Sequence, residues 1–231
     1  MKRLARITGT LMMIAGAGAL AWALTVWQWQ DPFTFAVQRL EQRELAQSFG
    51  RRLEQSAPAG AAVTSAVDVR RDLPRAATAW RKRSKRGDAI ARLRIPSLGL
   101  NAIIVNGTDT ETLKRGPGRY LGSAMPGEGE LVYVAGHRTT YGAPFSRIDR
   151  LRKGDPVFVE LPYGTLEYAI TGTRIVPATQ LSVLRSKGFE QLALQACHPR
   201  FFATQRIIAY AKPVGFTPPG GGEPTALETL G

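Results

Sequence analysis

The hydrophobic pattern of the chain begins with one long apolar run near the N-terminus. No charged residue occurs from Ile7 to Trp27, and a helix of about 21 residues spans the ~30 Å hydrocarbon core of a bilayer. Basic residues precede the run and tryptophans gather toward its far end, as in an interfacial aromatic belt; these are Lys2, Arg3, Arg6, Trp22, Trp27 and Trp29. The pattern predicts one transmembrane helix over residues 7–27.

A cleaved signal peptide is the alternative for this segment, because small residues lie around Ala15 to Ala19. The apolar run continues well past them and exceeds the ~7–15 residues of a signal h-region, which favours a retained signal-anchor. Arg39 and Arg43 follow the helix closely, so the difference in charge between its two ends is small and gives only weak evidence for its direction in the membrane. Residues 1–6 form a short basic head that normally stays in the cytosol. We expect a single-pass plasma-membrane protein with a cytoplasmic N-terminus and everything after Gln30 outside the cell.

The pattern over residues 28–87 predicts a stalk that is partly helical and partly flexible. Apolar positions recur among Gln, Glu and Arg over residues 33–55, which predicts a polar helix leaving the membrane. Residues 56–78 are rich in Ala, Pro and Ser without strong periodicity, which predicts a flexible linker. A basic run then follows, either as solvated linker or as a patch for anionic lipid or wall polymer; it comprises Arg81, Lys82, Arg83, Lys85 and Arg86.

From residue 88 the pattern changes to short β-rich runs separated by Gly, Pro and Asn turns. The candidate strands are Ala91–Ile95, Ala102–Val105, Leu131–Ala135, Pro156–Glu160, Leu166–Thr173, Gln191–Ala196 and Arg206–Ala211. Thr110–Lys114 and Pro144–Leu151 are candidates for short helices. Strands without βαβ alternation predict a mainly β fold over residues 88–215, a closed or nearly closed barrel. The Pro- and Gly-rich residues 216–231 predict a disordered tail.

Composition adds the size and charge of the molecule. The 231 residues, 44% of them hydrophobic, suffice for one domain with a real core plus appendages, which excludes a disordered protein. A formal charge of +13 implies attraction to an anionic partner such as nucleic acid, lipid headgroups or wall polymer. A nucleic-acid role makes little sense behind a signal-anchor. The single cysteine excludes a disulfide framework, and without a ligand cluster or an acidic calcium loop the sequence implies no metal or cofactor.

The candidate chemistry lies at the ends of predicted strands. Cys197 is either a buried small hydrophobe or a reactive thiol. It ends an apolar run directly before His198 and Pro199, and a thiol at a strand end is more accessible than a core cysteine. Arg206 opens the next strand nine residues later, so a hairpin would place this cation beside the thiol. His137 ends another apolar run.

Three stretches carry a further pattern, and they are residues 135–145 (AGHRTTYGAPF), residues 194–201 (LQACHPRF) and Gln205-Arg206. In this order behind a signal-anchor they resemble the signatures of the sortases, and in detail those of the class E sortases of actinobacteria. The similarity runs from about Ala89 to Pro213. It implies an eight-stranded β-barrel of the sortase type.

The sortase resemblance also implies a reaction. Cys197 would attack the Thr–Gly bond of a C-terminal sorting signal, and His137 would act as general acid and base. Arg206 would stabilise the oxyanion of the resulting thioacyl intermediate. An amine of a peptidoglycan precursor or pilin would then release the product. Class E similarity favours a Leu-Ala-x-Thr-Gly signal over Leu-Pro-x-Thr-Gly, with Tyr141, Leu194 and Ala196 as candidate substrate contacts.

The chain departs from the sortase pattern at several positions. Sortases usually carry Thr-Leu-x-Thr-Cys before the nucleophile, whereas Ala193 and Ala196 replace both threonines here. Arg119 stands where class E members often have a histidine. His198 should point to the opposite side of its strand from Cys197, which favours a structural or surface role over catalysis.

Two other functions are open at this point. An L,D-transpeptidase also pairs cysteine with histidine, but Gln195 and Ala196 replace the Ser/His-Gly that usually precedes its nucleophile. A catalytically weakened sortase-like barrel acting as a wall or pilus scaffold is the second, motivated by Ala193 and Ala196. Thiol labelling separates the scaffold from the enzyme, because a buried Cys197 would be inert.

Overall fold

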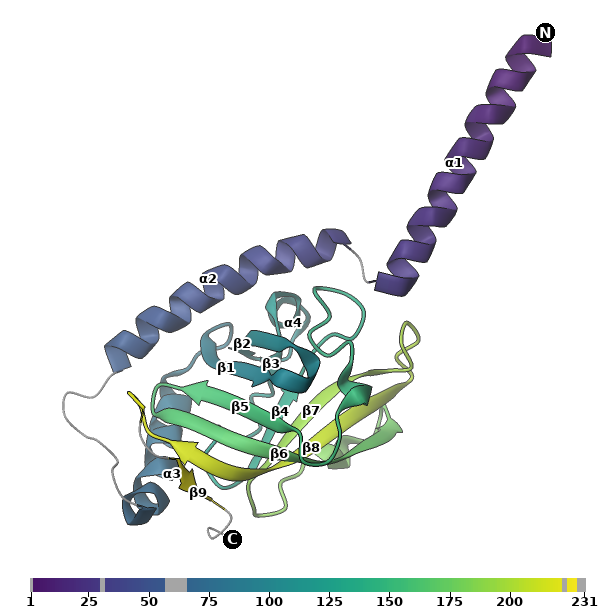
Figure 1. Ribbon diagram of the computed structural model, residues 1–231. Coiled ribbons are helices and arrows are strands. Elements are labelled where there is room, and N and C mark those ends of the chain that lie inside the picture. Colours follow the sequence, from purple (N-terminus) through teal and green to yellow (C-terminus); the bar gives the residue numbers. More distant parts are fainter. Residues whose placement is uncertain (1, 30–31, 57–65, 222–223, 228–231) are drawn as a thin grey trace.

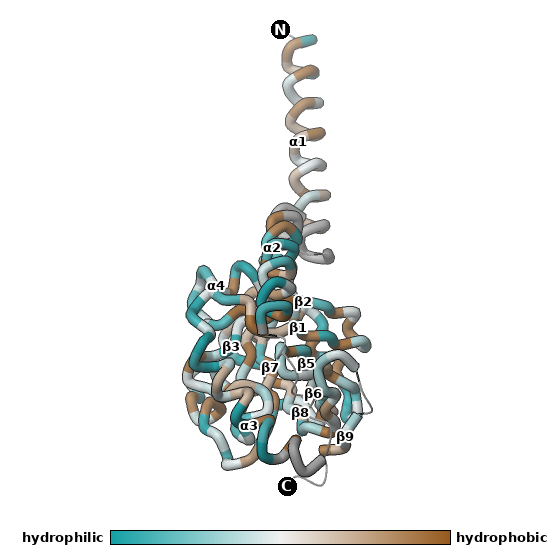
Figure 2. The backbone as a smooth tube through the Cα atoms, turned by 90° about the vertical axis from the view of Figure 1, so that its left-hand side faces the viewer, coloured by the Kyte–Doolittle hydropathy of each residue, from teal (hydrophilic) through white to brown (hydrophobic). Residues whose placement is uncertain are grey.

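The computed structural model describes residues 2–29, 32–56, 66–221 and 224–227. Helix α1 (Lys2–Trp29) extends away from the rest of the molecule (Figure 1). Its segment Arg3–Leu24 is long and apolar enough to cross a membrane. Apolar residues run along α1, whereas the next helix carries more hydrophilic ones (Figure 2). The predicted helix is therefore present, and its insertion in a membrane stays a prediction.

Eight strands close into the predicted barrel. Their order is β6-β5-β1-β2-β3-β4-β7-β8, and β6 also pairs with β8, which closes the ring. A short β9 adds to the end of β8. The bounds are β1 Ala89–Ile95, β2 Leu100–Asn106, β3 Gly118–Arg119, β4 Leu131–Ala135, β5 Pro156–Leu161, β6 Gly164–Pro177, β7 Gln191–His198, β8 Gln205–Thr217 and β9 Thr225–Ala226.

Short helices occupy the connections, and two sequence expectations change there. The helix α4 (Thr110–Arg115) forms as expected, with Asp109 as its N-cap. The segment Pro144–Leu151 instead contains only the 3-10 turn η2 (Ile148–Arg150). The remaining 3-10 turns are η1 (Pro96–Leu98) and η3 (Leu181–Leu184). In the expected disordered tail, β9 pairs with β8 and Leu227 is buried, while residues 222–223 and 228–231 lie outside the described residues.

The expectation of a flexible linker over residues 56–78 is wrong where the structure describes it. Residues 57–65 lie outside the described residues, and Ala66–Arg83 form the helix α3. One face of α3 packs into the barrel core, through Val69, Leu73, Ala77 and Trp80. Their helical spacing is a usable signal, but the Ala-rich composition and Pro74 obscure it. The indole of Trp80 donates a hydrogen bond to the Ile90 carbonyl at 3.1 Å, which fixes α3 against β1.

Helix α2 (Pro32–Ser56) lies across the barrel on the side from which α1 extends (Figure 1). Leu45 and Phe49 are buried against residues of β1 and β2. The Gln42 amide exchanges hydrogen bonds with β2, accepting from Ile103 N at 2.7 Å and donating to the Ile103 carbonyl at 3.3 Å. A helix predicted to leave the membrane as a polar stalk is therefore docked on the barrel.

Candidate active site

The three residues singled out by sequence share one face of the sheet. On β7, Leu192, Leu194 and Ala196 belong to the barrel core, whereas Ala193 belongs to a separate apolar cluster outside it. Side chains alternate along a strand, so Cys197 lies on the same side as Ala193. By the same alternation Arg206 shares the side of Ile208 and Tyr210 in that outer cluster, and His137 that of Tyr133.

The β7–β8 register places Arg206 directly opposite Cys197, as the hairpin expectation required. Directly opposite residues have Cβ atoms about 4.5–5.5 Å apart. Arg206 Nη1 donates to the carbonyls of Ala203 at 2.8 Å and Gln205 at 2.9 Å, which holds the guanidinium against the hairpin loop. Its Nε and Nη2 make no hydrogen bond to the described residues. Two donors beside the thiol therefore remain available for a ligand oxygen.

His137 follows β4, the parallel neighbour of β7. Ala135 pairs with Gln195, and Gly136 N donates to the Gln195 carbonyl at 2.9 Å. From this last pair the chain continues to His137 on one side and to Cys197 on the other, two residues further along each. Burial lowers the pKa of His137, so the neutral imidazole is favoured at neutral pH. Its Nε2 is buried and has no hydrogen-bond partner among the described residues.

A strained loop supports His137. Tyr141, Gly142 and Ala143 have consecutive positive φ angles of 51°, 65° and 41°. The Tyr141 ring lies 5.0 Å from the His137 ring, centroid to centroid. At Gly142 any Cβ would collide with the amide oxygen of Gln38 on α2. The loop that touches the imidazole is therefore packed against the helix that follows α1.

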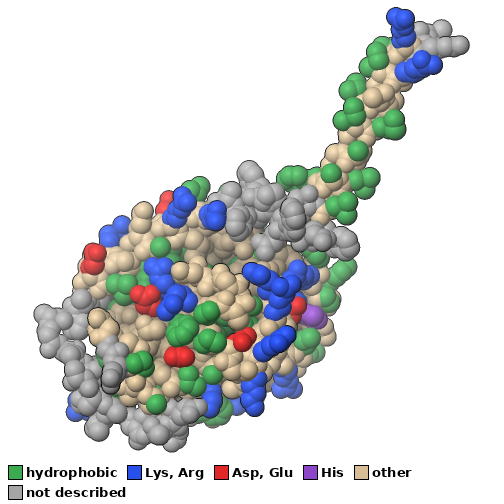
Figure 3. Space-filling view, in the orientation of Figure 1, with side chains coloured by type: hydrophobic (Ala, Val, Ile, Leu, Met, Phe, Trp, Pro, Cys, Tyr) green, Lys and Arg blue, Asp and Glu red, His purple; other side chains and the backbone are tan. Residues whose placement is uncertain are grey.

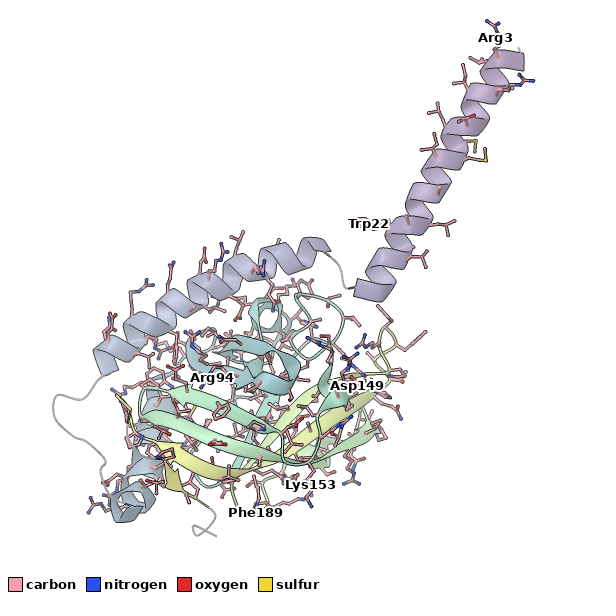
Figure 4. All side chains as sticks on the ribbon, viewed as in Figure 1. Arg3, Trp22, Arg94, Asp149, Lys153 and Phe189 are labelled. Atoms are coloured by element: carbon pink, nitrogen blue, oxygen red, sulfur yellow. The ribbon has the colours of Figure 1, made fainter. Side chains whose placement is uncertain are left out.

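His198 has a partner that sequence reasoning missed. Arg138, 6% exposed, places Nη1 2.7 Å from His198 Nδ1 and 3.4 Å from the Cys197 carbonyl oxygen. Its Nη2 forms an ion pair with Asp149 at 3.0 Å, and Asp149 lies at one end of the barrel (Figure 4). Arg138 directly follows His137, and His198 directly follows Cys197. The contacts of Arg138 therefore join the ends of β4 and β7 on the side of the sheet opposite Cys197 and Arg206.

Two of the expected substrate contacts need correction. Leu194 and Ala196 are fully buried in the barrel core, on the other side of β7 from Cys197, which the alternation of the strand already indicated. The outward positions are Ala193 and Gln195. Ala193 is itself fully buried, whereas Gln195 is half-buried, and its amide oxygen lies 3.5 Å from the hydroxyl of Tyr133 on β4.

Arg119 is a structural residue in this fold. It is buried, donates from Nε to the Asn106 amide oxygen at 3.0 Å, and donates from Nη1 to the Ser123 and Ala124 carbonyls. Burial lowers its pKa to about 10, so it is still charged at neutral pH. Among the described residues no group of three or more His, Cys, Asp or Glu side chains could hold a metal ion.

Comparison with known proteins identifies the family to which this site belongs. The sortase domain family matches residues 93–214, more than half of the chain, so the chain belongs to the sortase family. It is 36% identical to Sortase D of Bacillus subtilis over 132 residues, and 34% identical to Sortase SrtE1 of Streptomyces coelicolor over 159 residues. These alignments cover 55% and 61% of this chain but only 65% and 45% of the two relatives.

Solved structures agree with this assignment. Sortase E from Streptomyces avermitilis is 34% identical with a TM-score of 0.55, covering 62% of this chain and 99% of that one. The Sortase D5 transpeptidase of Clostridium perfringens, with a TM-score of 0.60 over 76% of this chain and 99% of that one, is 22% identical and shows the fold alone. The expected resemblance to class E is thus accompanied by an equally close one to Sortase D.

The lowered pKa of His137 predicts a pH dependence of stability. Between the folded and the unfolded pKa, the unfolded chain binds more protons than the folded protein, so the free energy of unfolding rises with pH. It should therefore fall as the pH is lowered from about 7.5 to about 5.5, and less so for His137→Gln. Urea unfolding of both proteins at both pH values measures the difference, with His198 common to both. Identical pH dependence in the two would contradict the effect of burial.

Proposed function

We propose that this protein is a membrane-anchored cysteine transpeptidase that cleaves a C-terminal sorting signal between Thr and Gly and transfers the protein to an amine. The supporting observation is the cross-strand pair of Cys197 and Arg206 on the outer face of the barrel, next to the strand end that carries His137. Membership of the sortase family supports the same reaction class. The partly exposed Cys197 favours an enzyme over a scaffold with an inert thiol.

His137 is suited to take up and return a proton in this reaction. A thiol near its ordinary pKa is only a few per cent thiolate at neutral pH, so it needs a base or a cationic partner. Because burial holds His137 neutral, its imidazole can accept the thiol proton when Cys197 attacks the Thr carbonyl. The imidazolium then protonates the departing Gly nitrogen. An acceptor amine reverses these steps, releasing the thiol and forming the new amide.

Arg206 is suited to stabilise the negative charge that forms on the Thr carbonyl oxygen. Its Nη1 is held by two loop carbonyls, which leaves Nε and Nη2 as a fixed pair of donors. A donor held in place before the reaction stabilises the oxyanion without reorganising, and this is a large effect in a partly buried site. The cross-strand pairing of Arg206 with Cys197 supports this role, because it sets the two residues on directly opposite positions of neighbouring strands.

The substrate and its setting follow from similarity rather than from geometry. Class E likeness favours a Leu-Ala-x-Thr-Gly signal, with a peptidoglycan precursor or pilin amine as acceptor. We propose Tyr141 and Gln195 as substrate contacts, because Tyr141 lies beside His137 and the half-buried Gln195 lies on the thiol side of β7. The apolar α1 supports anchoring by the N-terminus, with the barrel outside the cell near an anionic membrane or wall surface.

The first test is cleavage of a sorting-signal peptide by the full chain in detergent. We expect the wild type to cleave a Leu-Ala-x-Thr-Gly peptide and to form an adduct with it at Cys197. Cys197→Ala should abolish both, because the sequence contains no other thiol. Mass spectrometry and peptide chromatography measure the adduct and the cleavage. Cleavage by Cys197→Ala at the wild-type rate would refute the assignment.

Arg206 distinguishes a forked donor from a general positive charge. Arg206→Ala should lower kcat and kcat/KM together by about 10²–10³, because the lost interaction forms mainly in the transition state. Arg206→Lys keeps the charge but loses the planar fork, and should recover only a small part of the activity. Peptide kinetics, with folding checked by circular dichroism, gives both values. A near wild-type kcat for the lysine variant would leave Arg206 with a purely electrostatic role.

Arg138 should act as a positioning residue through the ends of β4 and β7. Arg138→Ala removes the contacts to His198 and to the Cys197 carbonyl, so kcat should fall by about tenfold or more while KM changes little. Arg152→Ala is the matched control, since Arg152 is exposed and nearby in sequence. Rates are taken per folded protein below the melting temperature of each variant. Equal losses in both variants, or a change confined to KM, would contradict this role.

A further inference from the structure

The chain between α1 and the active-site loop is short. Trp29 ends α1, and Gln38, nine residues later, is packed against Gly142. Three extended residues and six helical ones reach no further than about 20 Å. Since Gly142 adjoins Tyr141, which contacts His137, the end of the barrel that carries the active site must stay close to the point where α1 ends.

The β7–β8 loop at this end exposes two aromatic side chains. Phe201 is 54% exposed and Phe202 is 77% exposed. Phe201 and Ala203 have positive φ angles of 71° and 53°, so the loop holds an unusual backbone shape in order to present them. Arg200 of the same loop donates to the Ser146 carbonyl, which ties it to the segment that follows the His137 loop. Adjacent exposed phenylalanines are costly in water and mark a contact surface.

Exposed cations lie in the same loop and in the segment to which Arg200 donates. Arg147, Arg150 and Arg200 are exposed, and Lys and Arg side chains gather near the histidine that is visible in the space-filling view (Figure 3). In the ribbon view, the β7–β8 loop lies on the side of the barrel that faces the lower end of α1 (Figure 1). Because the Arg147 guanidinium donates to the Leu98 carbonyl at 2.9 Å, we leave it out and call the set Arg150, Arg200, Phe201 and Phe202 the active-site rim.

We propose that the active-site rim docks on the lipid surface, with Phe201 and Phe202 inserted at the level of the headgroups and the arginines against anionic lipid. Exposed aromatic residues flanked by cations are the features of a surface that lies in the membrane interface. Each basic residue near an anionic surface adds about 1 kcal/mol of attraction. The short connection between α1 and Gln38 keeps the active-site rim near the end of α1. This inference rests on the proposed anchoring by α1.

A lipid surface fits the rim better than a protein partner, because the tether already holds the rim at that surface in every molecule. Docking would orient the barrel so that the Cys197 thiol faces the space beside the bilayer surface rather than bulk solvent. It would therefore favour sorting signals that are still close to the membrane, and acceptor amines that are carried on a lipid. A peptide substrate contacting the phenylalanines is the competing explanation, and the experiments below separate the two.

The first experiment measures insertion without requiring activity. The full chain carrying Cys197→Ala and Phe202→Cys is labelled at its single thiol with the fluorophore NBD and reconstituted into vesicles of phosphatidylcholine and phosphatidylglycerol. We expect a blue-shifted emission that is quenched by spin-labelled lipid. Phe189→Cys in the same background is the matched control, because Phe189 is also an exposed phenylalanine, at 52%, but precedes the opposite end of β7 (Figure 4).

The second experiment separates lipid docking from substrate binding. Peptide turnover by Phe201→Ser/Phe202→Ser should fall by about fivefold or more in anionic vesicles and stay near wild type in detergent. Equal loss in both media would assign the phenylalanines to the substrate and overturn the proposal. Equal emission and quenching at positions 202 and 189 would overturn it as well. If the wild type proves inactive, the proposed reaction fails, but the NBD experiment still decides whether the rim docks.

Discussion

The register between β7 and β8 is the constraint on which the rest of the site depends. Twelve inter-strand pairs tie β6 to β8 and close the barrel, and seven tie β7 to β8, so neither strand can slip without breaking the closed ring. In this register Cys197 faces Arg206. A slip by one residue would send the thiol into the core among Leu194 and Ala196. The closed barrel therefore determines on which face of the sheet the side chains of Cys197 and Arg206 lie.

The candidate base is held by contacts of a different kind. His137 lies two residues beyond the last pair of β4, where a single hydrogen bond from Gly136 N to the Gln195 carbonyl continues the ladder. Arg138 behind it connects to the neighbouring strand end, and Tyr141 contacts its ring. Both contacts come from one loop, whose unusual backbone is in turn packed against α2. The residue proposed to exchange a proton is thus supported by packing and hydrogen bonds around it, while its own Nε2 has no partner in the part of the chain that the structure describes.

Helix α2 connects α1 to the active-site loop. A flexible stalk would leave the barrel free to rotate relative to the rest of the N-terminal segment, whereas α2 is docked on the barrel through Leu45, Phe49 and Gln42 and packs Gln38 against Gly142 of that loop. The buried Glu190 stabilises the opposite end of the barrel, where it accepts hydrogen bonds from Gly127 N, Gly129 N and the Tyr168 hydroxyl. Burial raises the pKa of this carboxyl. The end of the barrel away from Cys197 is thus held together by a buried carboxyl and its three donors.

The sequence by itself determined the apolar N-terminal helix, the positions of seven strands and the placement of Cys197, His137 and Arg206 at strand ends, because alternation, helical periodicity and Pro or Gly breaks are local properties of the chain. It also contained the information that Leu194 and Ala196 face away from the thiol. Only the tertiary structure decided that α2 and α3 pack on the barrel, that Arg138 joins His198 to the end of β4, and that Arg119 is a buried structural cation. Those contacts join residues far apart in the chain, and which of two faces is covered depends on neighbours that no local pattern specifies.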